Sequence, residues 1–136
     1  MQITQEINRH YYAISHYSDA AITLAAPPDE GRLVVRQSFV LTPHALQPAW
    51  PVTDIAQIDT AVLQQLVDNY PSDILLIGCG TASRFLHPQL LLPLQQQGIG
   101  VEMMTNRAAC QTFNTLVGDE RRVCAAVMLP ELISVN

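Results

Sequence analysis

The chain contains no lysine, and its basic side chains are seven arginines against 12 aspartates and glutamates. The absence of lysine excludes Schiff-base chemistry and a lysine general base. The formal net charge of −5 argues against a nucleic-acid-binding surface, because phosphate backbones are held by clustered basic side chains. Charged residues make up only 14% of the 136 residues and hydrophobic ones 49%, which predicts a folded chain with a sizeable core.

Long apolar runs and signal-peptide features are also missing. No run approaches the roughly 20 residues that a membrane-spanning helix needs, and the N-terminus lacks a basic stretch followed by an apolar one. We therefore expect a cytoplasmic protein without membrane insertion. Three cysteines without paired spacing, Cys79, Cys110 and Cys124, do not suggest a disulfide frame or a zinc site. No familiar catalytic set is present either, so we predict no metal, no cofactor and no catalytic residue.

The first part of the chain predicts antiparallel strands. Residues 11–41 alternate apolar with small or polar side chains and are divided by turn signals. Within them, 33–35 and 39–41 are expected to form one longer strand. Residues 43–59 are a proline-rich extended connector in which Trp50 is interpreted as a packed anchor, and a short helix follows at 61–67. The sequence leaves open whether the early strands form their own layer or extend the main sheet, and whether Trp50 is core or interface.

The second part predicts alternating strands and helices. The expected strands are 74–77, 99–103 and 123–129, and the expected helices are 88–97, in which Pro93 should cause a kink or an early end, and 106–117, which Thr105 can cap. The crossover between the first two strands should be parallel and right-handed. We therefore predict an α/β protein, a three-layer single domain over residues 1–136 with a mixed central sheet and covering helices.

A glycine-rich turn follows the first buried strand of this second part. Ligands in open α/β sheets bind outside the carboxyl ends of strands, so Gly78, Cys79 and Gly80 could meet a ligand there, with Arg84 close behind. A tight turn that needs unusual backbone angles explains the same glycines and is favoured. Cys79 could pair with His87 as a nucleophile, but a small residue in a turn is the simpler interpretation.

Two further groups of polar residues come from the last helix and the turn after it. Arg107, Cys110 and Asn114 share one side of the helix and could contact the glycine turn or a partner; local hydrogen bonding at the edge of the apolar stripe is equally well supported. Arg121 follows the helix and could help bind an acidic group near Arg107. A solvated turn with local ion pairs is the favoured alternative for that segment.

Several segments together resemble a known family, the Mth-type domain-of-unknown-function family four-nine-eight. The similar segments are 74–80, 98–105, 108–116 and 120–123. The resemblance implies a three-layer α/β fold with a mixed sheet and implies no established catalytic activity. Its mitochondrial branch includes an assembly factor of respiratory complex I that acts through protein contact, and another branch is adipogenesis-associated. The family more often has Gly-Thr-Gly at the turn, which weakens the case for Cys79 as a nucleophile.

The leading hypothesis is a non-catalytic accessory or assembly-type protein that acts through contact with a protein partner. The alternative is a site for a small acidic ligand or thiol redox chemistry at the Gly78–Gly80 turn and the 106–117 helix, and a homodimer is a further option. The candidate ligand- or partner-binding residues are expected near one end of the sheet. They are Gly78, Cys79, Gly80, Arg84, Arg107, Cys110, Asn114 and Arg121.

Overall fold

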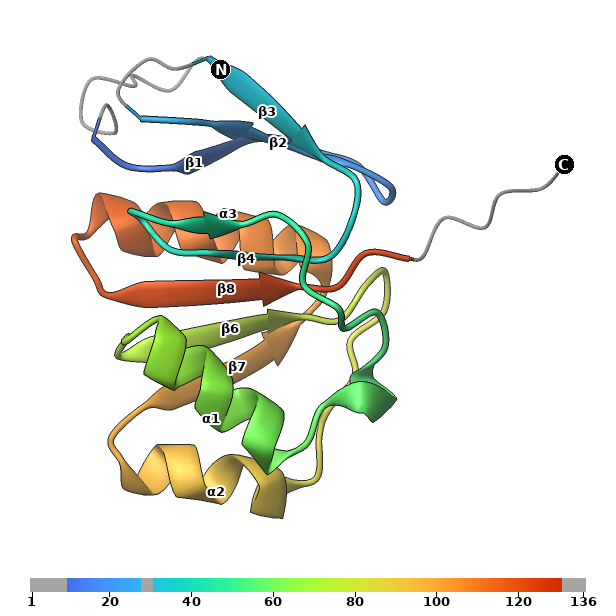
Figure 1. The fold of residues 1–136 in the computed structure, drawn as a ribbon, viewed down its shortest axis with the longest axis vertical. Coiled ribbons are helices and arrows are strands. Elements are labelled where there is room, and N and C mark those ends of the chain that lie inside the picture. Colours follow the sequence, from blue (N-terminus) through green and yellow to red (C-terminus); the bar gives the residue numbers. More distant parts are fainter. Residues whose placement is uncertain (1–9, 28–30, 131–136) are drawn as a thin grey trace, which may run out of the picture.

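The computed structural model describes residues 10–27 and 31–130, which form two β-sheets and three α-helices (Figure 1). The smaller sheet is antiparallel, with the strand order β1-β2-β3. Its strands are β1 (Ala13–Tyr17), β2 (Ile22–Ala25) and β3 (Arg32–Val35). The early strands therefore form a sheet of their own, which answers the question that the sequence left open.

The larger sheet is mixed and has the order β5-β4-β8-β6-β7. Its strands are β4 (Phe39–Leu41), β5 (Leu46–Gln47), β6 (Ile74–Gly78), β7 (Gly100–Met104) and β8 (Val123–Val127). β6 runs parallel to both β7 and β8, whereas β4 is antiparallel to β5 and β8. The three parallel strands are the predicted ones, and their carboxyl ends meet at one edge of the sheet.

Helices cover both faces of this central sheet (Figure 1). α1 (Thr60–Asn69) and α2 (Pro88–Gln96) lie on one face, and α3 (Asn106–Gly118) lies on the other. α3 contacts β6 and β8 of the central sheet and also β1 of the small sheet. The three-layer α/β fold with a mixed central sheet is thus as the sequence predicted, and the structure adds that α3 and the small sheet lie together on one side of it.

The core is divided by the central sheet into two clusters. Along β8, Val123, Ala125 and Val127 belong to the cluster under α3 and the small sheet, while Cys124 and Ala126 belong to the cluster under α1 and α2. This alternation follows from the two-residue period of a strand. Because all five residues of β8 are buried, this strand carries both clusters, and its residues are apolar throughout.

The predicted strand over residues 33–41 is wrong, because the chain leaves one sheet and enters the other within it. β3 ends at Val35, β4 begins at Phe39, and the buried Ser38 lies between them. The Leu129 N–H donates to Ser38 Oγ (2.9 Å), which fastens the crossing to the end of β8. A period-two pattern cannot show such a change of sheet, since Val35 before it and Phe39 and Leu41 after it all belong to the same cluster.

The connector after β4 is more ordered than predicted. It contains β5 and a short 3₁₀ turn at Ile55–Gln57, which Asp54 caps. Trp50 is only 7% exposed and its N–H donates to Ser38 O (2.8 Å), so it belongs to the core.

α2 continues to Gln96 despite Pro93. Within residues 10–27 and 31–130, no helix is long and apolar enough to span a bilayer.

Candidate functional site

The glycine turn lies at the carboxyl end of β6, where the strand meets the start of α3. Gly80 has φ +96°, a conformation that L-residues with side chains rarely adopt. At Gly78, an added Cβ would lie 2.5 Å from Asn106 Oδ1, which leaves no room for a side chain. Both glycines are therefore explained by the backbone path and by close packing, which is the interpretation that the sequence favoured.

Asn106 holds this turn in place. Its Oδ1 accepts the Gly80 N–H (2.9 Å), its Nδ2 donates to Met128 O (2.7 Å), and its own N–H donates to Gly80 O (2.8 Å). The Cys79 N–H donates to Met104 O (2.8 Å). Because the N–H groups of Cys79 and Gly80 are already bonded within the protein, the turn does not present them to an anion.

Sequence reasoning missed Asn106, which is 1% exposed and is one of three buried polar residues among those described. A signal was present, since an asparagine directly after the capping Thr105 begins the helix that follows a strand. Asparagine can satisfy a donor and an acceptor at once, which suits a junction where two backbone segments end. What could not be read from the sequence is that its partners come from residues 80 and 128.

The three thiols are poorly suited to nucleophilic or redox chemistry. Burial raises the pKa of Cys110 and of Cys124 to about 12, and burial also raises the pKa of Cys79 despite nearby Arg84. Cys79 Sγ lies 3.6 Å from Arg84 O, and His87 Nδ1 instead accepts the Gln89 N–H at the start of α2. A thiolate is the reactive form of cysteine, so these environments disfavour the proposed Cys79–His87 pair.

Thiol titration measures this directly. At pH 7.5 we expect a chromogenic disulfide reagent to modify only half-buried Cys79 in the folded protein, and slowly, because the thiol pKa is raised. In denaturant all three thiols should react at the rate of an ordinary cysteine. The Cys79→Ser variant should lose the slow phase. Rapid reaction of any thiol in the folded protein would contradict this assignment and restore the redox alternative.

A pocket of about 310 Å³ adjoins the glycine turn, and its charges do not favour an acidic ligand. We name it the turn pocket. Its walls include Asp19, Asp54 and Arg84 beside Cys79 and Gly80. Arg84 Nη1 lies 3.6 Å from Asp54 Oδ1, so the single arginine of the pocket already faces a carboxylate. An acidic ligand would have to displace that pairing and approach a second aspartate.

Arg107, Cys110 and Asn114 line a separate groove of about 380 Å³ between α3 and β1, which we name the α3 groove. Asn114 Oδ1 accepts the Ile14 N–H (2.9 Å) and its Nδ2 donates to Ile14 O (2.8 Å). Cys110 is 3% exposed. Asn114 thus joins the helix to the small sheet, a longer-range contact than the local hydrogen bonding considered from the sequence.

Arg121 lies at the opposite edge of the central sheet. β8 begins beside the start of β6, where Val123 pairs with Ile74, whereas the glycine turn follows the end of β6. The 13-residue α3 spans about 20 Å between Arg107 and this edge. The expectation that all eight candidate residues gather near one end of the sheet is therefore wrong, and Arg107 and Arg121 cannot hold one acidic group together.

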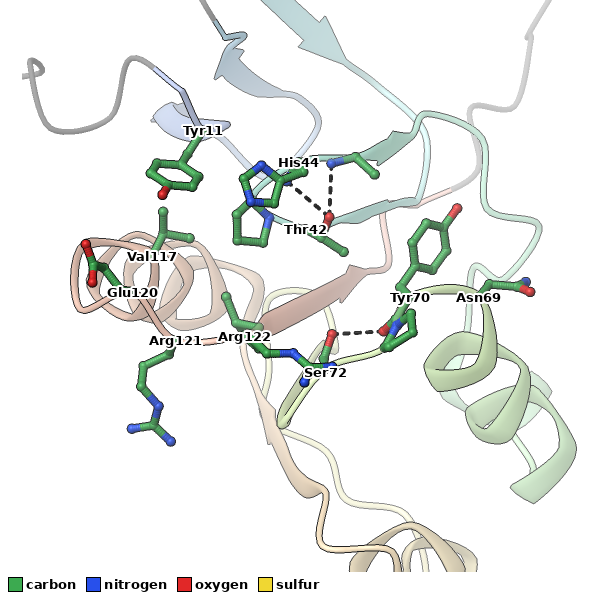
Figure 2. A pocket seen from close by; sticks show the side chains of 14 residues that line it. Tyr11, Thr42, His44, Asn69, Tyr70, Ser72, Val117, Glu120, Arg121 and Arg122 are labelled. Carbon is green, nitrogen blue, oxygen red and sulfur yellow. Dashed lines mark hydrogen bonds between the residues drawn. The ribbon is translucent and has the colours of Figure 1, made fainter.

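The edge with Arg121 carries a cleft of about 480 Å³ that the sequence did not indicate, which we name the amino-edge cleft (Figure 2). Its walls come from Tyr11 before β1, the loop between β4 and β5, the end of α1 with the residues that follow it, and the segment from the end of α3 to the start of β8. The rings of Tyr11 and His44 lie 5.0 Å apart, and Tyr70 stands on the other side. Arg121 points away from these side chains (Figure 2). The residues that line the cleft are far apart in the chain, so no local sequence motif predicts it.

No metal site was found within residues 10–27 and 31–130, where no group of three or more histidine, cysteine or acidic side chains could hold an ion. The candidate residues thus divide among the turn pocket, the α3 groove and the amino-edge cleft. Cys79, Gly80 and Arg84 line the turn pocket, and the buried Gly78 directly precedes them in the chain. Arg107, Cys110 and Asn114 line the α3 groove, and Arg121 lines the amino-edge cleft.

Comparison with known proteins agrees with this architecture. The zebrafish (Danio rerio) protein named NADH dehydrogenase (ubiquinone) 1 alpha subcomplex assembly factor 3 is 34% identical over 101 residues, which are 74% of this chain and 56% of that protein. The chain thus spans about half the length of this relative. A crystal structure of a Bordetella parapertussis protein is 30% identical with a TM-score of 0.74, covering 89% of this chain and 97% of that one.

Two further comparisons concern the fold and the family of the chain. A Bordetella pertussis protein described as a Mth938-like domain is 23% identical with a TM-score of 0.71, over 97% of this chain and 94% of its own, and shares the fold. The sequence model of the family described as "Protein of unknown function (DUF498/DUF598)" matches residues 14–128. This match covers most of the chain, from the second residue of β1 to just beyond β8, and includes all three described helices. The chain belongs to the DUF498/DUF598 family.

Proposed function

We propose that the protein is a non-catalytic accessory protein of the assembly type, which acts through contact with a protein partner. The observation that carries the proposal is a large aromatic side chain, Phe85, which is 77% exposed at the carboxyl edge of the central sheet. The bonded N–H groups of the glycine turn and the raised thiol pKa values support it further, because they disfavour the anion and redox alternatives.

The loop that bears Phe85 is held on both sides of this residue. Cys79 Sγ lies 3.6 Å from Arg84 O, and the Leu86 N–H lies 3.3 Å from Met103 Sδ. Leu86 itself is buried in the cluster under α1 and α2. Phe85 is therefore held outward by an anchored backbone. Aromatic residues presented in this way lose little conformational freedom on binding and are frequent centres of protein interfaces.

The surroundings of Phe85 suit the rim of such an interface. Arg84 and Asp54 form an ion pair whose side chains are more than half exposed, so the pair contributes little to stability. It can exchange partners with polar groups of another protein. The turn pocket is lined by Cys79, Gly80 and Arg84, so these three candidate residues lie close to the loop that bears Phe85, whereas Gly78 is buried.

The named relative supports the accessory role. The zebrafish protein is named as an assembly factor, and the matched region covers 56% of its length. Its partner is not carried over to this chain. A cytoplasmic location and a homodimer stay predictions, and the predicted protein partner is not identified.

Site-specific photo-crosslinking in the native host tests this function. We replace Phe85 with benzoylphenylalanine, a photoreactive residue of similar shape, and use the exposed Gln65 of α1 as the matched control position. We expect a discrete adduct between this chain and another protein at position 85 and none at position 65, because only the first lies at the proposed contact. No adduct above the control would contradict the proposal, and an adduct between two copies alone would favour a homodimer.

A further inference from the structure

The two edge strands of the small sheet differ in whether another element bonds their outward backbone groups. In the order β1-β2-β3, β1 and β3 are the outer strands. The edge of β1 is closed by α3, since Asn114 bonds both the N–H and the C=O of Ile14. β3 pairs only with β2 among the described residues. The edge of β3 is therefore the one at which backbone groups can meet another chain.

The hydrogen-bond pattern identifies which backbone groups face outward. The Ala26 N–H donates to Gly31 O (3.0 Å), which makes these opposite residues a hydrogen-bonded pair. Such pairs alternate along an antiparallel ladder, so Arg32 and Val34 fall in the non-hydrogen-bonded positions. Their N–H and C=O groups then point away from β2. The same alternation correctly accounts for Ile14, whose outward groups are taken by Asn114.

Within the part of the chain that the structure describes, β3 shows none of the usual protections of an edge strand. Proteins guard free edges with lysine, proline, bulges or a covering element. The chain has no lysine, β3 contains no proline, and its pairing with β2 is regular, whereas β1 has an irregularity between Ile14 and His16. Leu33 and Val34 are 42% and 52% exposed, so both faces of the strand offer apolar surface at the edge.

Two arginines flank β3 among the described residues. Arg32 begins β3 and Arg36 directly follows it, and both are exposed. The ion pairs within residues 10–27 and 31–130 use other arginines, Arg84 and Arg122. In a protein of net charge −5, a strand flanked by two exposed arginines favours an acidic neighbour.

We propose that the free edge of β3 binds an extended acidic segment of a partner protein, which adds a fourth strand to the small sheet. The outward groups of Arg32 and Val34 would supply the backbone hydrogen bonds. Carboxylates four residues apart on the added strand would face Arg32 and Arg36, with an apolar residue between them. A second copy fits less well, because antiparallel pairing centred on Val34 would place Arg32 opposite Arg36 of the other copy.

This inference does not depend on the Phe85 surface and is tested separately. The probe is a fluorescein-labelled peptide of sequence Glu-Thr-Val-Thr-Glu, and its control has lysine in place of both glutamates. We measure binding to the full chain by anisotropy and amide exchange of residues 32–35 by NMR. We expect preference for the acidic peptide, and slowed exchange at Arg32 and Val34, which exchange faster than Leu33 and Val35 in the free protein.

Two variants distinguish strand pairing at the β3 edge from nonspecific binding of the peptide to the surface. Val34→Pro removes an outward N–H without breaking the ladder to β2, and should weaken binding at least about tenfold. The double variant Arg32→Glu with Arg36→Glu should reverse the preference toward the lysine peptide, and it serves alone if the proline variant does not fold. Equal binding of both peptides would overturn the proposal. Protection of Arg32 and Val34 that appears on raising the protein concentration without peptide would also overturn it, in favour of a second copy.

Discussion

Replacing Asn106 with alanine is expected to lower the free energy of unfolding by about 3 kcal/mol, because it leaves the half-buried Gly80 N–H and the buried Met128 carbonyl without partners. The side chain accepts the Gly80 N–H and donates to Met128 O, and it is almost fully enclosed. A methyl group fills neither role and cannot admit water without opening the packing. Urea unfolding followed by the fluorescence of Trp50, the one tryptophan of the chain, measures the loss.

The matched control is Asn69→Ala, which alters an exposed asparagine at the end of α1 and should change stability by less than about 0.5 kcal/mol. A double-mutant cycle adds a sharper test. Gly78→Ala alone should destabilise, since its Cβ would meet Asn106 Oδ1 at 2.5 Å. Combined with Asn106→Ala, the added methyl finds space, so the two losses should not add. Strict additivity would show that the clash lies elsewhere.

Replacing Phe113 with alanine is expected to cost about 4 kcal/mol, the second large effect. Phe113 lies on α3, is fully buried, and belongs to the cluster that joins the helix to both sheets. Alanine leaves a cavity between three elements that cannot collapse together without moving the small sheet. The same unfolding measurement reports the loss in the midpoint, with the denaturant slope unchanged.

The control for Phe113 is Gln111→Ala, an exposed position on the same helix, which should leave stability within about 0.5 kcal/mol of the parent. Amide exchange adds a local readout, because the cavity should loosen the joint between α3 and β1. We expect the Ile14 amide, which bonds Asn114, to exchange faster in Phe113→Ala. A loss below about 1 kcal/mol would mean that the core does not depend on this ring.

The parallel half of the fold was predictable because its signals are local. The continuous apolar run of β6, the cap at Thr105 and the amphipathic α3 each express a rule that acts over a few residues. The Gly78–Gly80 turn was also correctly interpreted as a backbone requirement. For the same reason the change of sheet at Ser38 was missed, since the residues on both sides of it obey one pattern.

The candidate site was only partly predictable. Gly78 to Arg84 are close in sequence and remain close in space. Arg107 and Arg121 were grouped by their chemistry, but a helix about 20 Å long separates them. Asn106 was overlooked, because its importance depends on carbonyl and amide groups supplied by residues far away in the chain.

The sequence by itself determined the α/β class, the order of the later strands and helices, the exclusion of lysine chemistry, and the need for glycine at the turn. These follow from composition, local periodicity and backbone sterics. Only the tertiary structure decided that the early strands form a separate sheet, that Asn106 and Asn114 fasten the layers, that Phe85 faces outward, and that β3 pairs with β2 alone among the described strands. Each of these depends on which distant backbone groups and side chains become neighbours, and that is set by packing over the whole chain.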